Sequence, residues 1–110
     1  MPEQPFILHL TERSLWDAAR ERGAYEMSTR GRTLEEEGFI HCSTHEQLPK
    51  VAAFLYGSYE GPDELVVLVI DPARLGAPLK YEAPEPGGDE FPHVYGPIPV
   101  DAVVDVEPWS

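Results

Sequence analysis

The stretch ELVVLVID, residues 64–71, is the most apolar run in this chain. Its aliphatic residues follow one another without the polar alternation of a half-exposed strand, which predicts a strand covered on both faces. Asp71-Pro72 then ends the strand in a turn. We expect this segment to form the central strand of a sheet.

Shorter apolar segments on both sides of this run predict the other strands. They comprise residues 6–10, 24–27, 39–43, 79–82, 92–95 and 102–107. Polar loops are expected at 28–32 and at 84–88, which is rich in proline and glycine. Strands and helices alternate without a regular βαβ rhythm, which favours an α+β fold over a doubly wound one. At 110 residues, the chain is expected to form a single domain over residues 1–110.

Capping residues predict where the short helices begin. Thr11 suits the N-cap of a helix that continues with helical spacing to Gly23. The segment 33–38 predicts a single capped turn. Ser43-Thr44-His45-Glu46 fits a capping box, so another helix is expected to start there. Pro49 prevents one regular helix and predicts a second piece from 49 to about 56.

Charge is distributed unevenly along the chain. The formal net charge is −12, which argues against binding nucleic acid or an anionic membrane through bulk electrostatics. Residues 1–33 are neutral overall and contain five arginines, so an anionic ligand is expected to dock there. Arg13 and Arg30 are candidate phosphate contacts. The alternative is that these arginines lie on exposed faces and keep the chain soluble.

The remaining global features predict a cytoplasmic protein. The N-terminal MPEQPFILHL lacks the charge pattern and long apolar core of a signal peptide. No stretch approaches the roughly 20 apolar residues of a membrane span. One cysteine allows no intramolecular disulfide and suggests no structural zinc site.

Three of the four histidines are followed, two residues later, by a hydroxyl side chain. These stretches are His9-Leu10-Thr11, His41-Cys42-Ser43 and His93-Val94-Tyr95. Side chains at i and i+2 of a strand point to the same face, so each stretch would present an imidazole beside a hydroxyl. If the three strands are neighbours, the six side chains line one polar cleft. Histidine suits such a site because its unperturbed pKa of ~6.5 allows proton transfer near neutrality.

The same residues have plainer explanations, which stay open. A histidine between apolar residues is often a structural group bonded to a backbone carbonyl. Cys42 points away from His41, so the two cannot form a catalytic pair, and Cys42 is most simply a core residue. Three histidines can also hold zinc. Their wide separation and the lack of HxH or HExxH do not support it, and no metal is expected.

Five motifs make the chain resemble a bacterial family catalogued as domain of unknown function 952. The resemblance covers roughly residues 6–107. The motifs occur in the family's order: HLT at 9–11, EGFIHCST at 37–44, QLP at 47–49, LVIDPARL at 68–75 and FPHVYGPIP at 91–99.

This resemblance implies an ADP-ribosyltransferase-like fold, with two small facing β-sheets, short helices and an NAD-type ligand in the cleft. His9 and Thr11 would lie on the first ligand-binding strand, with His9 gripping the ribose. His41 and Ser43 would lie on the second cleft strand. His93 would stand where true transferases carry a catalytic glutamate, and Leu10 replaces the usual glycine. The histidine-lined cleft is more similar to the tRNA 2′-phosphotransferase branch of this fold.

The leading hypothesis is an enzyme that uses NAD or acts on an ADP-ribose- or phosphate-bearing metabolite. His41 and His93 would be catalytic, and the ligand-binding residues would be His9, Thr11, Ser43, Tyr95, Arg13 and Arg30. The alternatives are a non-catalytic nucleotide-binding or interaction module and a small metal-dependent hydrolase. The substrate and the oligomeric state stay open.

Overall fold

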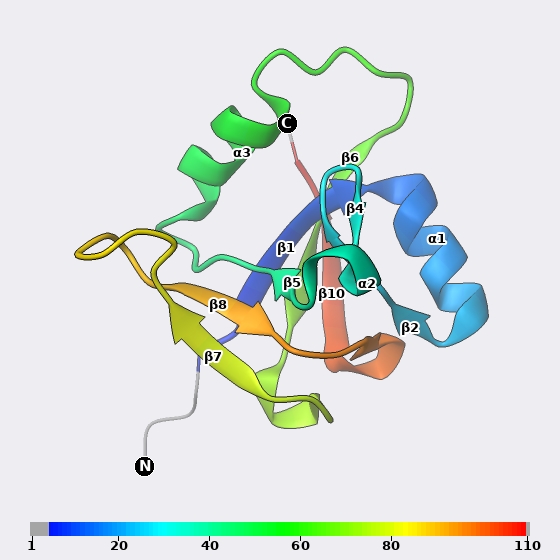
Figure 1. The fold of residues 1–110 in the computed structure, drawn as a ribbon. Coiled ribbons are helices and arrows are strands. Elements are labelled where there is room, and N and C mark those ends of the chain that lie inside the picture. Colours follow the sequence, from blue (N-terminus) through cyan, green and yellow to red (C-terminus); the bar gives the residue numbers. More distant parts are fainter. Residues whose placement is uncertain (1–4, 110) are drawn as a thin grey trace.

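The computed structural model describes residues 5–109 and confirms an α+β fold. Its main sheet has β6 (Leu65–Ile70) at the centre, with β1 (Ile7–Glu12) and β10 (Val103–Pro108) on its two sides. Both pairings are antiparallel. The expectation that the apolar run forms a central strand is confirmed (Figure 1).

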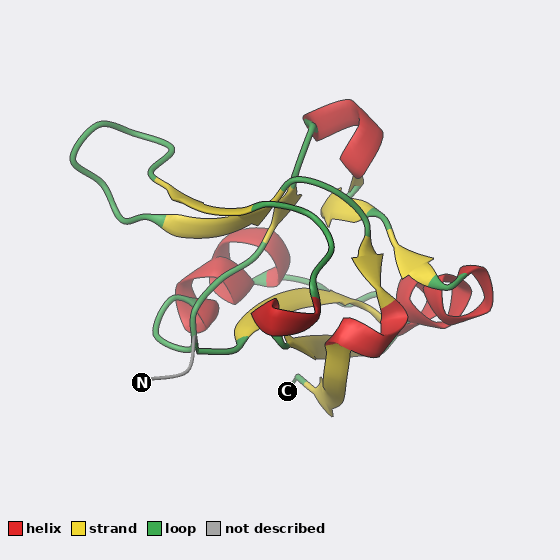
Figure 2. Ribbon diagram, turned by 90° about the horizontal axis from the view of Figure 1, so that it is seen from below, coloured by secondary structure: helices red, strands yellow, loops and turns green. Residues whose placement is uncertain are grey.

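A second sheet has β8 (Phe91–Val94) between β5 (Ile40–His41) and β7 (Leu79–Glu82). Its register sets His41 directly opposite His93 and Glu82 opposite Phe91. Figure 2 shows the β7–β8 hairpin as a layer apart from the main sheet. Two short pairs complete the strands: β2 (Ala24–Tyr25) with β9 (Ile98–Pro99), and β3 (Met27–Thr29) with β4 (Arg32–Thr33).

In the part of the chain that the structure describes, three α-helices and two 3₁₀ turns connect these strands. The α-helices are α1 (Arg13–Arg22), α2 (Leu34–Glu37) and α3 (Leu48–Tyr56). The 3₁₀ turns are η1 (Pro72–Arg74) and η2 (Val100–Ala102). Within residues 5–109, no helix has the length and apolar character needed to cross a membrane.

The main sheet is buried on both faces, which explains the unbroken apolar run of β6. One face packs Leu68 of β6 into a core with Ile40 and Val94 of the second sheet. The other face packs Val67 and Val69 beneath α3. Burial of apolar area on both sides of one strand is the main stabilising contribution to this arrangement.

Two helix starts differ from the sequence-based expectation. Thr11 is not an N-cap: it lies within β1, and Glu12 occupies the N-cap of α1. Ser43 does not cap a helix either, because its backbone pairs with Leu8 of β1. The adjacent Thr44 and Gln47 exchange the capping-box hydrogen bonds instead, Gln47 N to Thr44 Oγ1 at 3.2 Å and Thr44 N to Gln47 Oε1 at 3.0 Å.

Other local expectations hold. The Thr33–Glu36 capping box around α2 is present. A turn at residues 45–47 precedes α3, whose bounds agree with the predicted second piece from 49 to about 56. Pro49 lies in the first turn of α3, where its missing N–H has no helical partner to lose.

Two variants test which residue caps the turn that leads into α3. Thr44→Ala should lower the free energy of unfolding by about 1 kcal/mol, the usual cost of a lost cap. Glu46→Ala is the matched control, since Glu46 is exposed and would matter only if Ser43 were the cap. Urea unfolding measures both, and a larger loss in Glu46→Ala than in Thr44→Ala would contradict the observed cap.

Candidate functional site

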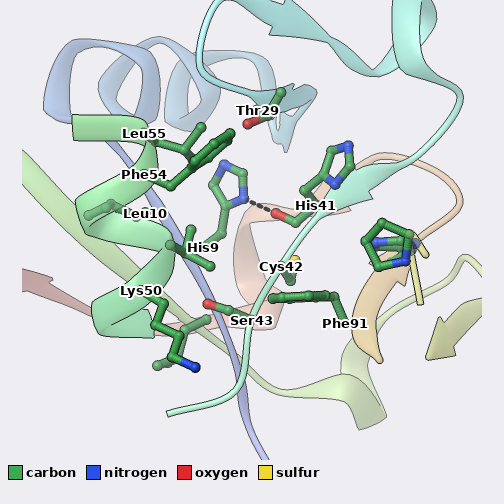
Figure 3. A pocket seen from close by; sticks show the side chains of 14 residues that line it. His9, Leu10, Thr29, His41, Cys42, Ser43, Lys50, Phe54, Leu55 and Phe91 are labelled. Atoms are coloured by element: carbon green, nitrogen blue, oxygen red, sulfur yellow. Dashed lines mark hydrogen bonds between the residues drawn. The ribbon is translucent and has the colours of Figure 1, made fainter. Parts of the chain in front are cut away.

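A cavity of about 570 Å³ opens between the outer edge of β1, the segment 41–43 and α3. Figure 3 shows side chains entering it from these different elements. Much of its wall is apolar, and its polar members are His9, Thr29, His41, Ser43, Lys50 and His93. Of the six residues expected to line one cleft, four therefore border the same cavity.

The cavity exists because β1 and the segment 40–43 are joined at one point and then diverge. Leu8 and Ser43 exchange two backbone hydrogen bonds of 2.8 Å. Continued antiparallel pairing would set Leu10 opposite His41. Instead, the carbonyl oxygen of His41 lies 2.7 Å from Nδ1 of His9 (Figure 3). The His9 imidazole therefore takes the place of the backbone N–H that would bond to this carbonyl in a regular ladder, and it separates β1 from the segment 40–43.

Both ring nitrogens of His9 are bonded within the protein. Nε2 lies 2.8 Å from the hydroxyl of Tyr25, and that hydroxyl lies 2.8 Å from Oγ1 of Thr11. A carbonyl oxygen only accepts, so Nδ1 carries the proton. In the neutral ring Nε2 is then an acceptor, so the Tyr25 hydroxyl donates to it and accepts from Thr11.

Burial keeps this imidazole neutral. Desolvation lowers the pKa of His9 to about 4, and the hydrogen bond to His41 offsets it only in part. His9 is thus a structural group in this state, as in the plainer explanation, and it has no free nitrogen to grip a ribose.

His41 and His93 lie side by side on the outer face of the second sheet. Their ring centroids are 5.1 Å apart, and Phe39 stacks on His93 at 4.3 Å. His41 is half-buried, with Nε2 3.7 Å from a carboxylate oxygen of Glu37. Burial lowers the pKa of His41, and the electrostatic effect of the neighbouring His93 lowers it further.

A carboxylate, that of Glu82, bonds to one ring nitrogen of His93. Nδ1 of His93 lies 2.9 Å from Oε1 of Glu82, and the Tyr95 hydroxyl donates to the same oxygen. The bonds from Tyr95 and then from His93 lower the pKa of Glu82, so the carboxylate is ionised. An ionised carboxylate only accepts, so Nδ1 of His93 carries a proton.

The other nitrogen of His93 is unpaired. Only 5% of His93 is exposed, and its Nε2 has no hydrogen-bond partner among the described residues. His93 lines the cavity, whereas Glu82 does not. A buried polar atom without a partner costs free energy, and native structures retain such atoms mostly where they serve a function.

Helix α3 supplies cavity residues that the sequence analysis did not identify. Lys50, Val51, Phe54 and Leu55 share one face of the helix and line the cavity. Phe54 is 87% exposed, the most of any large apolar residue that the structure describes. Glu82 and Tyr25 were missed as well, since only the strand register brings them to His93 and His9.

Four of the predicted ligand-binding residues do not line the cavity. Thr11 is buried behind Tyr25, and Tyr95 bonds to Glu82. Arg13 pairs with Glu64 at 2.7 Å. Arg30 lies over the ring of Tyr56, 4.6 Å from its centroid, and donates to the carbonyl oxygen of Leu55.

Cys42 is buried in the core, and burial raises the pKa of its thiol, which makes it a poor nucleophile. It borders the cavity as well as the core. Among residues 5–109, no three His, Cys, Asp or Glu side chains gather in a way that could hold a metal ion.

The sequence and the fold together assign the chain to a family. A family model described as "Protein of unknown function (DUF952)" matches residues 10–106, and the chain belongs to this family. No curated protein matches.

Two solved structures of protein CC0527 from Caulobacter crescentus are similar to the chain. The crystal structure is 34% identical with a TM-score of 0.75, covering 96% of this chain and 86% of that one. The solution NMR structure is 37% identical with a TM-score of 0.68, covering 92% and 81%.

The buried neutral His9 makes stability depend on pH. The pKa of His9 rises from about 4 in the folded state to ~6.5 on unfolding. The contribution of His9 to the free energy of unfolding is therefore fully present above pH ~6.5 and is lost as the pH falls to about 4. This loss lowers the free energy of unfolding by about 3 kcal/mol. Urea unfolding from pH 7 to pH 4 should therefore show a smaller decline in His9→Gln than in the wild type.

The matched control is His45→Gln, because His45 is exposed and lies outside the cavity. It should decline as the wild type does. An equal pH dependence in His9→Gln and wild type would contradict the neutral, buried state of His9.

Proposed function

We propose that the protein is an enzyme that binds a nucleotide-type metabolite in the histidine-lined cavity, either NAD or an ADP-ribose- or phosphate-bearing compound. The observation that carries this proposal is Nε2 of His93, a buried atom without a hydrogen-bond partner among residues 5–109, on a residue that lines the cavity. An atom of this kind is available to accept a proton from a bound ligand or to return one. His41 and Ser43 border the same cavity.

The cavity suits a ligand with a flat ring and an anionic group. Its apolar wall includes Phe54 from α3 and Phe91 from β8, which Figure 3 shows entering from different sides. Aromatic side chains stack on the face of any nucleobase. Lys50 lines the same cavity and supplies a cation for phosphate.

The ADP-ribosyltransferase-like fold belongs to this proposal. Two observations support this fold. The two three-stranded sheets pack on either side of a common core, and histidines from both sheets line one cavity. In this setting His93 would provide the acid–base group in place of a glutamate, while His9 would shape the cleft without holding the ribose.

We also propose a cytoplasmic location. It is supported by the single cysteine, Cys42, which is buried as a free thiol. Reduced cysteines are the rule in reducing compartments.

Ligand binding and turnover are measured separately. NAD and ADP-ribose are titrated into the protein while the histidine ring resonances are followed by NMR, and nicotinamide or phosphate release is followed by chromatography. The proposal predicts that His41 and His93 shift and His45 does not, and that product accumulates. Binding without product would favour a non-catalytic module. No shift with either compound would contradict the proposed function.

A variant tests the stacking wall. Phe54→Ala should weaken ADP-ribose binding at least about fivefold, since base stacking on an aromatic ring contributes ~1–3 kcal/mol. Phe6→Ala is the control: Phe6 is an exposed phenylalanine that does not line the cavity. Isothermal titration calorimetry measures both, and equal affinities for the two variants would exclude stacking on Phe54.

A further inference from the structure

We propose that His41 and His93 form an acid–base pair that shares one proton, with Glu82 as the positioning residue of His93, for displacement by water at a phosphate ester. This inference rests on the proposed function and names the chemistry of the same site. It starts from the register of the second sheet, which sets the two histidines directly opposite each other on β5 and β8.

Proximity allows only one of the two imidazoles to carry a charge readily. Their ring centroids are 5.1 Å apart, and both residues line the cavity. At this separation two positive charges repel strongly in a partly buried setting, so the second proton binds less readily than the first. The pair therefore holds one proton over a range of pH.

Glu82 determines which imidazole carries that proton. Its carboxylate lies 2.9 Å from Nδ1 of His93 and forms an ion pair when His93 is protonated. Glu37 offers His41 a weaker partner at 3.7 Å. His93 is therefore the acid, with its second proton on Nε2, and neutral His41 is the base.

Other charged or titratable groups near the pair complete its surroundings. Lys80 of β7 lies over the ring of Tyr95, 4.8 Å from its centroid. Lys50 of α3 and His9 of β1 line the same cavity. The groups that face the pair are thus Glu37, Lys50, Lys80, Glu82, Tyr95 and His9, of which His9 is kept neutral by burial.

The step balances with water as the co-reactant. His41 accepts a proton from water while the water oxygen forms a bond to phosphorus. The bond from phosphorus to the leaving oxygen breaks, and that oxygen keeps the electron pair and takes the proton from Nε2 of His93. The products are a phosphate and an alcohol, and proton exchange between His41 and His93 restores the starting state.

The pair is tested by NMR titration of the free protein. In His93→Gln the titration midpoint of His41 should move upward by about one pH unit, because a unit charge about 5 Å away is removed. In the control His45→Gln it should not move. A His41 midpoint that is the same in wild type and His93→Gln would overturn the shared proton.

The role of Glu82 has its own readout. At a pH high enough to remove the shared proton, the ¹⁵N shifts of the neutral His93 ring should report a proton on Nδ1 in the wild type and a mixture of tautomers in Glu82→Gln. Glu85→Gln, in the exposed 84–88 loop, should match the wild type. This arm remains informative if His93→Gln fails to fold, and an unchanged tautomer in Glu82→Gln would overturn the positioning role.

Inorganic phosphate is the probe for the substrate class. Phosphate should raise the His41 midpoint in the wild type and in His45→Gln, and its half-saturating concentration should be at least about fivefold higher in His93→Gln. No response of His41 to phosphate would overturn the phosphate-ester chemistry. A coupled pair in a protein that binds neither NAD nor ADP-ribose would instead refute the proposed function and leave the pair intact.

Discussion

The hydrogen bond from His9 Nδ1 to the carbonyl oxygen of His41 is the interaction on which the site depends. It joins the edge of the main sheet to the second sheet at the place where backbone pairing stops. A ladder hydrogen bond there would hold neighbouring strands about 4.8 Å apart. An imidazole in its place keeps β1 and the segment 40–43 further apart, and the cavity lies between them.

In this arrangement the three histidines have different roles. His9 has two internal partners, is buried and neutral, and fixes the distance between the sheets. His93 has one internal partner, and its other nitrogen has none in the described part of the chain. His41 is half-buried, its pKa is lowered by that burial, and its ring lies beside the ring of His93. Residues with the same i, i+2 hydroxyl pattern thus have different chemistry, because burial and partners differ.

Much of the fold could be predicted from the sequence. The apolar run 65–70 identified the central strand because burial on both faces leaves a local signature. The local sequence does not show which of two overlapping capping boxes forms, Ser43 with Glu46 or Thr44 with Gln47. The choice depends on the pairing of Ser43 with Leu8, a contact between residues 35 positions apart in the chain.

The site was predictable only in part, for the same reason. The strand pattern pointed to the histidines, but their partners come from strand register and topology. Tyr25 reaches His9 from β2, and Glu82 reaches His93 from β7. Two of the i+2 hydroxyls bond to the partner of their histidine and not to the histidine itself: Thr11 bonds to Tyr25, and Tyr95 bonds to Glu82.

The central claim is that His9 is structural and that His41 and His93 are left to meet a ligand. A crystal structure of the protein with ADP-ribose tests it most directly. The account predicts the ligand in the cavity beside α3, within hydrogen-bond distance of Nε2 of His93, with the bond from His9 to His41 intact. A ligand bound elsewhere, or one that replaces the His41 carbonyl as the partner of His9, would contradict it.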